Sequence, residues 1–449
     1  MLSPEAEIRR RDASGGILGE AALSLYGAAG HVAAPVAGAF LKWREKSGKE
    51  DSARRGERFG IGARMRPPGP LIWVHAASVG ETLTALPLIE RLTERGPTIL
   101  LTTGTVTAAE IAGGRLPASA IHQFVPIDTP AAIGRFLDHW RPDLVLFAES
   151  EFWPTTFRAL RRRSLPLAIV NARMSPRSFR AWRRFAPVAR AVLSRPDLFL
   201  AQAEGDAERL KNLGARHVRV SGNLKFDAPP PPADETAVTR IRGDIGGRPV
   251  LLAASTHPGE EAAMIFAHAE VAKDGGRPLT ILAPRHPERG EVLATEIEAA
   301  GLSLRRRSKG EHIEGGTAIY LADTIGEMGL WYRVADMAFL GGSMVPRGGQ
   351  NPIEPAKLMV PVIHGAHVEN FRDVYDALRK AGAAKMVADG ASLAAIVRLL
   401  IREPQERVRL ARAAHACVER FTGALERTLE ALDPYLRNLG DHDEAAPRA

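Results

Sequence analysis

The feature that most constrains this fold is a repeated alternation of short apolar segments with longer amphipathic ones, broken once by four consecutive prolines at 229–232. Apolar runs of this length are typical of buried strands, and the segments between them are typical of helices of roughly 10–15 residues. Such an alternation builds right-handed β-α-β units and a parallel sheet that is covered on both faces. The predicted strands before the prolines are 71–75, 98–102, 143–147, 165–170 and 198–200, and those after them are 249–254, 278–283, 318–321, 337–340 and 360–363.

Four prolines cannot continue a helix or a central strand, so this run marks a stiff linker between two α/β domains. The chain of 449 residues is long enough for two separate cores. In such folds ligands bind beyond the carboxyl ends of the strands, so we expect a cleft between two facing sheets. The predicted parts are an N-terminal segment 1–66, a first domain 67–227, the linker 228–234, a second domain 235–439 that includes the C-terminal helices, and a polar, disordered tail 440–449.

The N-terminal segment contains an apolar stretch, 17–41, which only Glu20 and His31 interrupt. It is long enough to span a bilayer, and it lacks the basic start and cleavage site of a secretory signal. Nine basic residues against four acids follow at 42–66, and such an excess binds anionic headgroups and holds the following domains on the cytoplasmic side. The stretch is therefore predicted to span the membrane or to lie in its interface, and a soluble Ala-rich helix is the alternative.

The net charge of +8 favours an anionic partner. The chain has no basic stripe interleaved with aromatic residues and no zinc knuckle, so nucleic acid is the least favoured of these partners. The single cysteine, Cys417, excludes a disulfide framework and a cysteine-based zinc site. A Walker lysine loop and a dinucleotide glycine motif are both missing, which disfavours an ATPase and a dehydrogenase. We expect no cofactor and no metal site.

In the first domain, polar residues follow the predicted strands. Glu81 begins a helix after a turn that contains Ser78, and it serves either to compensate the helix dipole or as a carboxylate base. Glu149 and Glu151 follow the third strand, where two carboxylates are poor core residues and reasonable site residues. Arg173 follows the next strand and suits a carboxylate or a phosphate.

In the second domain, the glycine-rich stretch 341–349 lies between a buried strand and a predicted helix. Asn351 is the expected N-cap, Pro352 the first helical residue, and Glu354 the third. Backbone N–H groups and the positive helix end would converge there on an anion. A flexible loop with a capping box is the alternative.

Together with polar groups after the other strands, this stretch predicts a nucleotide pocket. Its candidate residues are Lys225, Ser255, Thr256, Arg285, His286, Gly341, Gly342, Ser343, Gly348, Gly349, Asn351 and Glu354.

Five motifs in order resemble the 3-deoxy-D-manno-octulosonic acid (Kdo) transferases of lipopolysaccharide synthesis over about residues 20–430. They are His75-Ala-Ala-Ser78-Val-Gly80-Glu81, Glu149-Ser-Glu151-Phe-Trp153-Pro154, Asn171-Ala-Arg173-Met-Ser175, Gly222-Asn223-Leu-Lys225-Phe-Asp227 and the stretch 341–355. One departure is Gln350, which stands where the family usually has histidine; a hydrogen-bonding role remains open to it, whereas an ionisable role does not.

The resemblance implies the GT-B fold, with two Rossmann-like domains and an N-terminal membrane-associated helix at the cytoplasmic face of the inner membrane. It implies that CMP-Kdo binds the second domain, with Glu354 on the ribose hydroxyls, 341–349 at the phosphate and Arg285 against the nucleotide. The implied acceptor is a lipid A precursor, the tetra-acylated disaccharide bisphosphate, held in the first domain, with Glu81 deprotonating its attacking hydroxyl. The implied reaction is a metal-independent, inverting transfer.

Two other functions remain open. One is a different GT-B enzyme, either a transferase that uses a UDP-sugar or a hydrolysing UDP-sugar epimerase. The other is a non-catalytic, membrane-bound protein that binds a sugar nucleotide, which would tolerate loss of Glu81. Glu149 and Glu151 compete with Glu81 for the role of base, and either could instead orient the acceptor together with Ser78 or Arg173.

Overall fold

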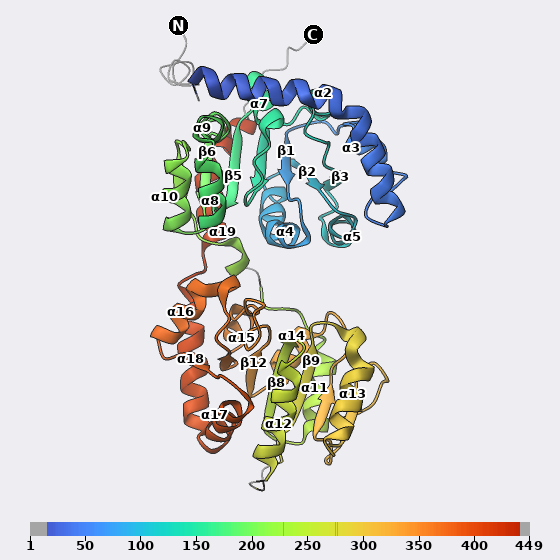
Figure 1. The fold of residues 1–449 in the computed structure, drawn as a ribbon, viewed down its shortest axis with the longest axis vertical. Helices are drawn as coiled ribbons and strands as arrows, with labels where there is room; N and C mark the ends of the chain where they lie inside the picture. The colour runs from blue at the N-terminus through green and yellow to red at the C-terminus, as the bar shows by residue number, and fades with distance from the viewer. Residues whose placement is uncertain (1–15, 228, 274, 276, 441–449) are drawn as a thin grey trace. The chain divides into compact units, whose positions relative to one another are not determined.

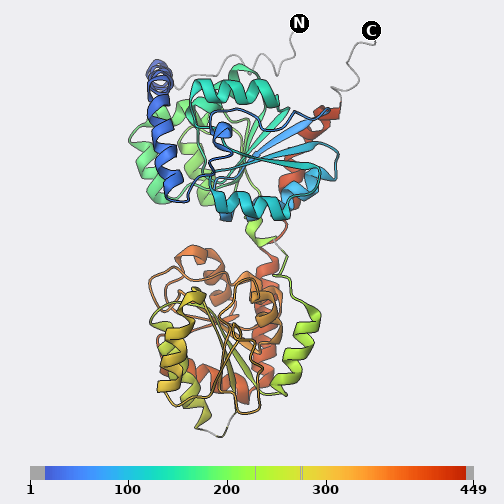
Figure 2. The ribbon, with the colours of Figure 1, turned by 90° about the vertical axis from the view of Figure 1, so that its right-hand side faces the viewer.

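The computed structural model describes residues 16–227, 229–273, 275 and 277–440, so the predicted tail beyond residue 440 lies outside the described residues. The chain forms two compact units, one made of Met1–Ala228 with Thr422–Ala449 and the other of Pro229–Phe421. Both units are parallel α/β layers, as the alternation predicts (Figures 1 and 2).

The first unit contains a seven-stranded sheet in the order β3-β2-β1-β4-β5-β6-β7. All neighbouring strands run parallel. The strands are β1 (Leu71–His75), β2 (Thr98–Thr103), β3 (Ala120–Phe124), β4 (Leu144–Ala148), β5 (Leu167–Ala172), β6 (Leu198–Ala201) and β7 (Val218–Val220). The helices are α2 (Gly16–Lys46), α3 (Arg55–Arg58), α4 (Val79–Thr93), α5 (Val106–Arg115), α6 (Pro130–Trp140), α7 (Pro154–Arg162), α8 (Pro176–Arg183), α9 (Ala186–Leu193), α10 (Glu204–Asn212), the 3₁₀ turn η1 (Leu224–Phe226) and α19 (Ala424–Gly440).

The second unit repeats this plan with the strand order β10-β11-β9-β8-β12-β13-β14. Its strands are β8 (Val250–Thr256), β9 (Leu279–Pro284), β10 (Leu304–Arg306), β11 (Ile319–Leu321), β12 (Met337–Leu340), β13 (Val362–His364) and β14 (Ala384–Met386). Its helices are α11 (Glu235–Ile245), α12 (Glu260–Ala272), α13 (Gly290–Ala299), α14 (Met328–Val334), α15 (Ile353–Lys357), α16 (Arg372–Lys380), α17 (Gly390–Arg402) and α18 (Pro404–Glu419), with 3₁₀ turns η2 (Pro287–Arg289) and η3 (Glu369–Phe371).

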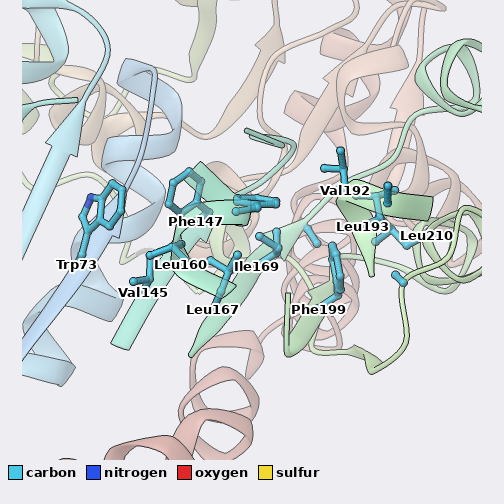
Figure 3. Packing of buried hydrophobic residues seen from close by; sticks show 14 of the residues in the cluster. Trp73, Val145, Phe147, Leu160, Leu167, Ile169, Val192, Leu193, Phe199 and Leu210 are labelled. Carbon is cyan, nitrogen blue, oxygen red and sulfur yellow. The ribbon is translucent and has the colours of Figure 1, made fainter. Parts of the chain in front are cut away.

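Each sheet is buried on both faces, because successive side chains of a strand point to opposite sides. Along β1, Leu71 and Trp73 enter one hydrophobic cluster, whereas Ile72 and Val74 enter the other. Figure 3 shows the cluster of Trp73, with residues of β4, β5, β6 and the covering helices around it. This two-sided burial explains why the strands are continuous apolar runs in the sequence.

The sequence analysis did not predict four of the strands, and each of these lies at an edge of its sheet: β3, β7, β10 and β14. Their residues are only partly buried, so they do not form the apolar runs that mark the central strands. The predicted central strands are present with ends shifted by no more than a few residues, which is the usual uncertainty of element boundaries.

The C-terminal helix α19 corrects the expectation that all C-terminal helices cover the second domain. Leu429 and Leu432 of α19 lie in the same buried cluster as Ile72 of β1. The Asp227 carboxylate accepts hydrogen bonds from the N–H groups of Gly423, at 2.6 Å, and Leu425. The helix therefore completes the first unit, and the local sequence could not reveal this, because its apolar face would suit either sheet.

The apolar N-terminal stretch is one helix, α2, which packs on the first unit (Figure 1). Gly19 lies so close to α9 that a Cβ atom there would meet the Pro187 carbonyl oxygen, and Leu23 is buried in the core. Large apolar side chains on another part of its surface are exposed, among them Ile17, Leu18 and Leu25. Among the helices that the structure describes, none has the length and apolar character needed to cross a membrane.

Candidate active site

The candidate residues of the first unit gather at the carboxyl ends of β1 and β4. These strands are neighbours in the sheet, and the chain reverses its direction of strand addition between them. Such a switch point leaves a crevice beyond the strand ends, where open α/β sheets bind ligands. In the second unit the corresponding neighbours are β8 and β12, so both predicted sites lie at switch points.

Glu81 lies in the first turn of α4 and forms a capping box with Ser78. The Glu81 Oε2 atom accepts hydrogen bonds from the N–H groups of Ala77, at 2.6 Å, and Ser78, at 3.3 Å. The Ser78 hydroxyl in turn accepts from the Glu81 N–H at 3.3 Å. The short turn after β1 thus fixes the carboxylate at the edge of the sheet.

The pKa of Glu81 is raised from its ordinary value of 4.5 to about 7. Burial is the main cause, and the negative charges of Glu151 and Glu149 add to it; the hydrogen bonds from Ala77 and Ser78 oppose it without cancelling it. A carboxylate that only capped a helix would have a lowered pKa. Near neutral pH, Glu81 can therefore both accept and release a proton.

The two competing carboxylates have partners of their own. The Glu149 Oε1 atom lies 2.9 Å from the Lys225 ammonium, and the Glu151 Oε2 atom accepts a 2.7 Å hydrogen bond from the Trp153 indole N–H. Arg173 has an exposed side chain, and its carbonyl accepts a 2.6 Å hydrogen bond from the Ser150 hydroxyl. The structure therefore groups Glu81, Glu149 and Glu151 around one edge.

Lys225 is the predicted donor-binding residue that belongs to the first unit. It belongs to η1 of the first unit and pairs with Glu149, whereas the remaining donor candidates are in the second unit. In its motif, Asn223 accepts the Lys225 N–H at 3.0 Å, which shapes the turn that presents the lysine.

Two buried residues that the site prediction left out support this edge. The His75 ring packs against Phe147 and Trp153, and burial lowers its pKa to about 3, so it is neutral. The Asn171 side-chain oxygen accepts the Leu224 N–H at 3.0 Å, joining the end of β5 to η1. Both stand in the quoted motifs, which is the signal that could have identified them.

Three residues at strand ends adopt the left-handed backbone conformation: Glu149 (φ 56°), Asn171 (φ 52°) and Ser255 (φ 53°). This conformation is uncommon for residues other than glycine, least so for Asn, and it stores strain that clusters at functional sites. Arg141, Ser164 and Met359, outside the candidate sites, share this conformation, so it is consistent with a site at these strand ends and does not by itself identify one.

In the second unit, the glycine-rich turn does not offer all of its amides to a ligand. The Glu260 carboxylate, from the start of α12, accepts hydrogen bonds from the N–H groups of Gly342 at 2.7 Å, Ser343 at 3.0 Å and Met344 at 2.9 Å, and also from His257 at 2.9 Å. Glu260 is fully buried. These three turn amides are thus already paired with the protein's own anion, and a contact of the 341–349 stretch with a phosphate stays a prediction that concerns its other groups.

The turn itself is tightly packed. A Cβ atom at Gly341 would lie 2.2 Å from the Ser255 carbonyl oxygen, so only glycine fits there. The buried Ser343 hydroxyl donates to the Leu340 carbonyl at 2.5 Å and accepts the Gly365 N–H at 2.8 Å. Gly348 and Gly349 have positive φ, and Asn370 packs against Gly348. These residues hold the turn in shape.

Four basic side chains near this turn form a cluster that we call the basic cluster: His257, Arg285, His286 and Arg347. The rings of His257 and His286 lie 5.9 Å apart, and Arg285 follows β9 with its side chain exposed. Burial lowers the pKa of His257, and the neighbouring charges of His286, Arg347 and Arg285 lower it further, against the opposing effect of Glu260. The site prediction missed His257 and Arg347, although both are next to its candidates.

Asn351 and Glu354 are in contact, but the helix begins later than predicted. The Asn351 side-chain oxygen accepts the Ile353 N–H at 3.0 Å, and its amide donates to Glu354 Oε1 at 3.2 Å. The helix α15 has only five residues, so its dipole contributes little to anion binding. Burial raises the pKa of Glu354.

Gln350, which stands where the resembled family usually has histidine, has a main-chain contact: its carbonyl oxygen accepts a 2.7 Å hydrogen bond from the Tyr375 hydroxyl.

The remaining donor candidates lie beside these groups. Thr256 is buried at the end of β8, where its carbonyl accepts the Arg285 N–H at 2.9 Å, and His286 is exposed beside Glu288. Over the part of the chain that the structure describes, no three residues of the types that ligate metals form a group that could hold a metal ion.

Comparisons with known proteins agree with the motifs. Residues 53–228 match the family described as 3-Deoxy-D-manno-octulosonic-acid transferase (kdotransferase). The chain is 39% identical over 396 residues to the 3-deoxy-D-manno-octulosonic acid transferase of Bordetella pertussis, covering 84% of this chain and 91% of that protein. It is 34% identical over 400 residues to the transferase of the same name from Haemophilus influenzae, covering 86% and 92%.

Among solved structures, a glycosyltransferase from Rickettsia africae aligns with a TM-score of 0.56 at 12% identity, over 83% of this chain and all of that one. At this identity the likeness concerns the fold alone, and it confirms the two-domain GT-B architecture.

Proposed function

Because this chain belongs to the family of 3-deoxy-D-manno-octulosonic acid (Kdo) transferases, we propose that it moves Kdo from CMP-Kdo to a lipid A precursor by metal-independent, inverting displacement. Glycosyl transfer of Kdo is the activity of the family. The donor nucleotide, the acceptor, the mechanism and the site roles are our proposal.

The observation that carries the mechanism is Glu81, whose pKa is raised to about 7 beside two other carboxylates. A general base works best when its pKa lies near the working pH. Glu81 takes the proton of the acceptor hydroxyl as its oxygen forms a bond to the anomeric carbon of Kdo. The bond from that carbon to the CMP phosphate oxygen breaks, and CMP leaves with the electron pair. A single displacement of this kind inverts the anomeric centre.

Glu149 and Glu151 assist by their charge. With Glu149 held by Lys225 and Glu151 held by Trp153, both stay in place beside Glu81 and favour the protonated form that it reaches after the reaction. Their negative field also stabilises the positive charge that develops at the anomeric carbon. Ser78 and Arg173, at the same edge, are available to orient the acceptor.

The basic cluster supports the proposal for the donor. CMP-Kdo carries a phosphodiester and a carboxylate, and arginine is well suited to both groups. Arg285 and Arg347 lie beside His257, and the leaving phosphate needs such cations as its charge grows. The 341–349 turn then acts through its shape, held by Glu260, and Glu354 stays our candidate for the ribose hydroxyls.

The helix α2 supports attachment to the cytoplasmic face of the inner membrane. It is docked on the first unit through Gly19 and Leu23, and it leaves Ile17 and Leu18 exposed by 90% and 75%. Apolar side chains on one part of a docked helix suit insertion into the interface of a bilayer rather than a span across it. The basic residues of 42–66 would add attraction to anionic lipids.

The test is a product assay with purified protein in detergent. CMP-Kdo, generated in the reaction, and the tetra-acylated disaccharide bisphosphate are the substrates, and mass spectrometry follows the lipid. We expect a lipid product heavier by one or more Kdo residues and release of CMP, with no metal added. Transfer from a UDP-sugar, or UDP release without CMP release, would instead favour the alternative GT-B function.

A further inference from the structure

A second cationic site lies in the first unit, in a pocket of about 230 Å³. Its lining includes five arginines and one carboxylate: Arg158, Arg161, Arg162, Arg195, Arg216 and Glu20. The arginines come from α7 and from the segments just before β6 and β7, and Glu20 comes from α2. Residues far apart in the sequence thus bring their positive charges to one hollow.

The positive charge of this pocket is not balanced by the protein. Glu20 pairs with Arg195 at 2.7 Å, and Arg161 lies 3.8 Å from Asp197. Arg158, Arg162 and Arg216 have no ion-pair partner among the residues that the structure describes. Guanidinium groups held close together repel one another, and an anion that binds between them relieves the repulsion. Guanidinium forks match the geometry of a phosphate.

This pocket is separate from the transfer site. Arg195 precedes β6 and Arg216 precedes β7, so both lie at the amino ends of their strands. Glu81 and Glu149 follow β1 and β4, and therefore lie at the carboxyl ends of the same parallel sheet. The pocket lies at the opposite edge of the sheet, and neither the donor nor the reacting end of the acceptor explains its charge.

The surroundings of Glu20 on α2 indicate which kind of phosphate-containing molecule fits this pocket. Ile17 precedes Glu20 by one helical turn of α2 and is 90% exposed, and the neighbouring Leu18 is 75% exposed. An apolar surface beside a phosphate-sized cationic pocket matches an amphiphile, with acyl chains against the helix and a charged group in the pocket. Free phosphate would use the arginines but not the apolar residues.

We propose that this arginine pocket binds the phosphate of an anionic phospholipid headgroup. The inference deepens the membrane attachment proposed above, since it adds a specific headgroup site to a general attraction. It predicts a saturable preference for phosphatidylglycerol over phosphatidylcholine, because the choline ammonium would be repelled by the arginines.

The test uses short-chain lipids that remain soluble, so that it does not depend on membrane attachment. Isothermal titration calorimetry measures binding of dihexanoyl phosphatidylglycerol, dihexanoyl phosphatidylcholine and inorganic phosphate to the full chain. The variant R158Q/R162Q/R216Q removes the three arginines without an ion-pair partner. The control R115Q/R277Q/R412Q removes the same number of charges from exposed positions elsewhere. Melting curves check that both variants are folded.

We expect saturable binding of the phosphatidylglycerol to the unaltered protein and to the control. We expect the pocket variant to bind it about 10- to 100-fold more weakly, as the loss of three partly exposed ion pairs implies. Equal affinities in the pocket variant and the control would overturn the proposal. Inorganic phosphate binding as tightly as the lipid would overturn the assignment to a lipid headgroup. Because these lipids are soluble, the results bear on the headgroup site alone, and attachment through the apolar residues of α2 is measured separately by flotation with vesicles.

Discussion

The Lys225 ammonium lies 2.9 Å from the Glu149 carboxylate, across the edge of the sheet at which Glu81 begins its helix. This ion pair involves one of the two carboxylates whose negative charges, after burial, raise the pKa of Glu81. The position of Lys225, which the sequence suggested for the donor, therefore bears on the proposed base, and the pairing leads to the first prediction.

Lys225→Met should shift the pH dependence of kcat/KM to higher pH. Without the ammonium, the Glu149 charge is unpaired and favours the protonated form of Glu81 more strongly, so the base is lost at a higher pH than the present value of about 7. Rates measured from pH 5.5 to 9 give the midpoint. Lys211→Met, on the exposed surface of α10, is the matched control and should leave the midpoint in place. An unchanged midpoint with Lys225→Met would contradict the coupling.

Glu81→Gln should lower turnover by roughly 10²- to 10⁴-fold, the usual size of general-base catalysis. Affinity for CMP should persist, since the nucleotide is expected to bind the second unit. Turnover and CMP titration are compared for Glu81→Gln, Glu149→Gln and Glu151→Gln, with the exposed Glu90→Gln as a control. If Glu81→Gln kept near-normal turnover, the base would have to be sought in the Glu149 and Glu151 pair.

The same Glu81→Gln variant should melt at a higher temperature than the unaltered protein at pH 8. Below about pH 4.5 the carboxyl is protonated in the folded and the unfolded chain alike. Between pH 4.5 and 7 the unfolded chain loses this proton first, so the carboxyl destabilises the fold increasingly as the pH rises, and above about pH 7 the penalty is constant. Melting curves from pH 4.5 to 8 should show a growing gap between the two proteins. A gap that closes with rising pH would mean that the pKa of Glu81 is lowered in the fold.

Glu260→Gln should destabilise the second unit and weaken CMP binding. The Glu260 carboxylate accepts hydrogen bonds from four backbone N–H groups through its two oxygens. A glutamine side chain has one acceptor oxygen, and its NH₂ group would face the remaining backbone N–H groups, which are also donors. Each buried donor left without an acceptor costs about 1–3 kcal/mol. Thermal melting and CMP calorimetry measure the two effects, with the exposed Glu298→Gln as a control. Unaltered melting would show that the turn does not depend on this carboxylate.

Replacing Ile17, Leu18 and Leu25 by serine should reduce retention on membranes without unfolding the first unit. These side chains are exposed, whereas Leu23 of the same helix is part of the core, so deletion of the whole segment would test folding rather than attachment. Flotation with vesicles in high salt measures retention by apolar contact, because salt screens the attraction of the basic residues. The control replaces Val292, Ile325 and Val408, which are exposed on the second unit, by serine. Equal retention of both variants would argue against α2 as the attachment element.

The central strands and the position of the candidate sites could be predicted from the sequence. Apolar runs such as Leu71–His75 are continuous because a parallel sheet buries both of its faces. Short continuous apolar runs that alternate with helical segments therefore indicate a parallel α/β fold. The polar residues that follow these strands then had to meet at one edge, because parallel strands end on the same side. Glu81, Glu149 and Glu151 were placed together by this reasoning alone, and the family motifs pointed to the same residues.

Only the tertiary structure decided which of these groups are partners. Glu260 and Gly342 are 82 residues apart, and nothing in either segment shows that the carboxylate accepts hydrogen bonds from the turn that the sequence predicts to contact a phosphate. Lys225 could equally have served a ligand, and α19 could have packed on either sheet. The pattern of apolar and polar residues in a segment indicates which of its own side chains are buried. The ion-pair partner of a charged residue, and the sheet on which a helix packs, depend instead on which distant segments come into contact when the chain folds.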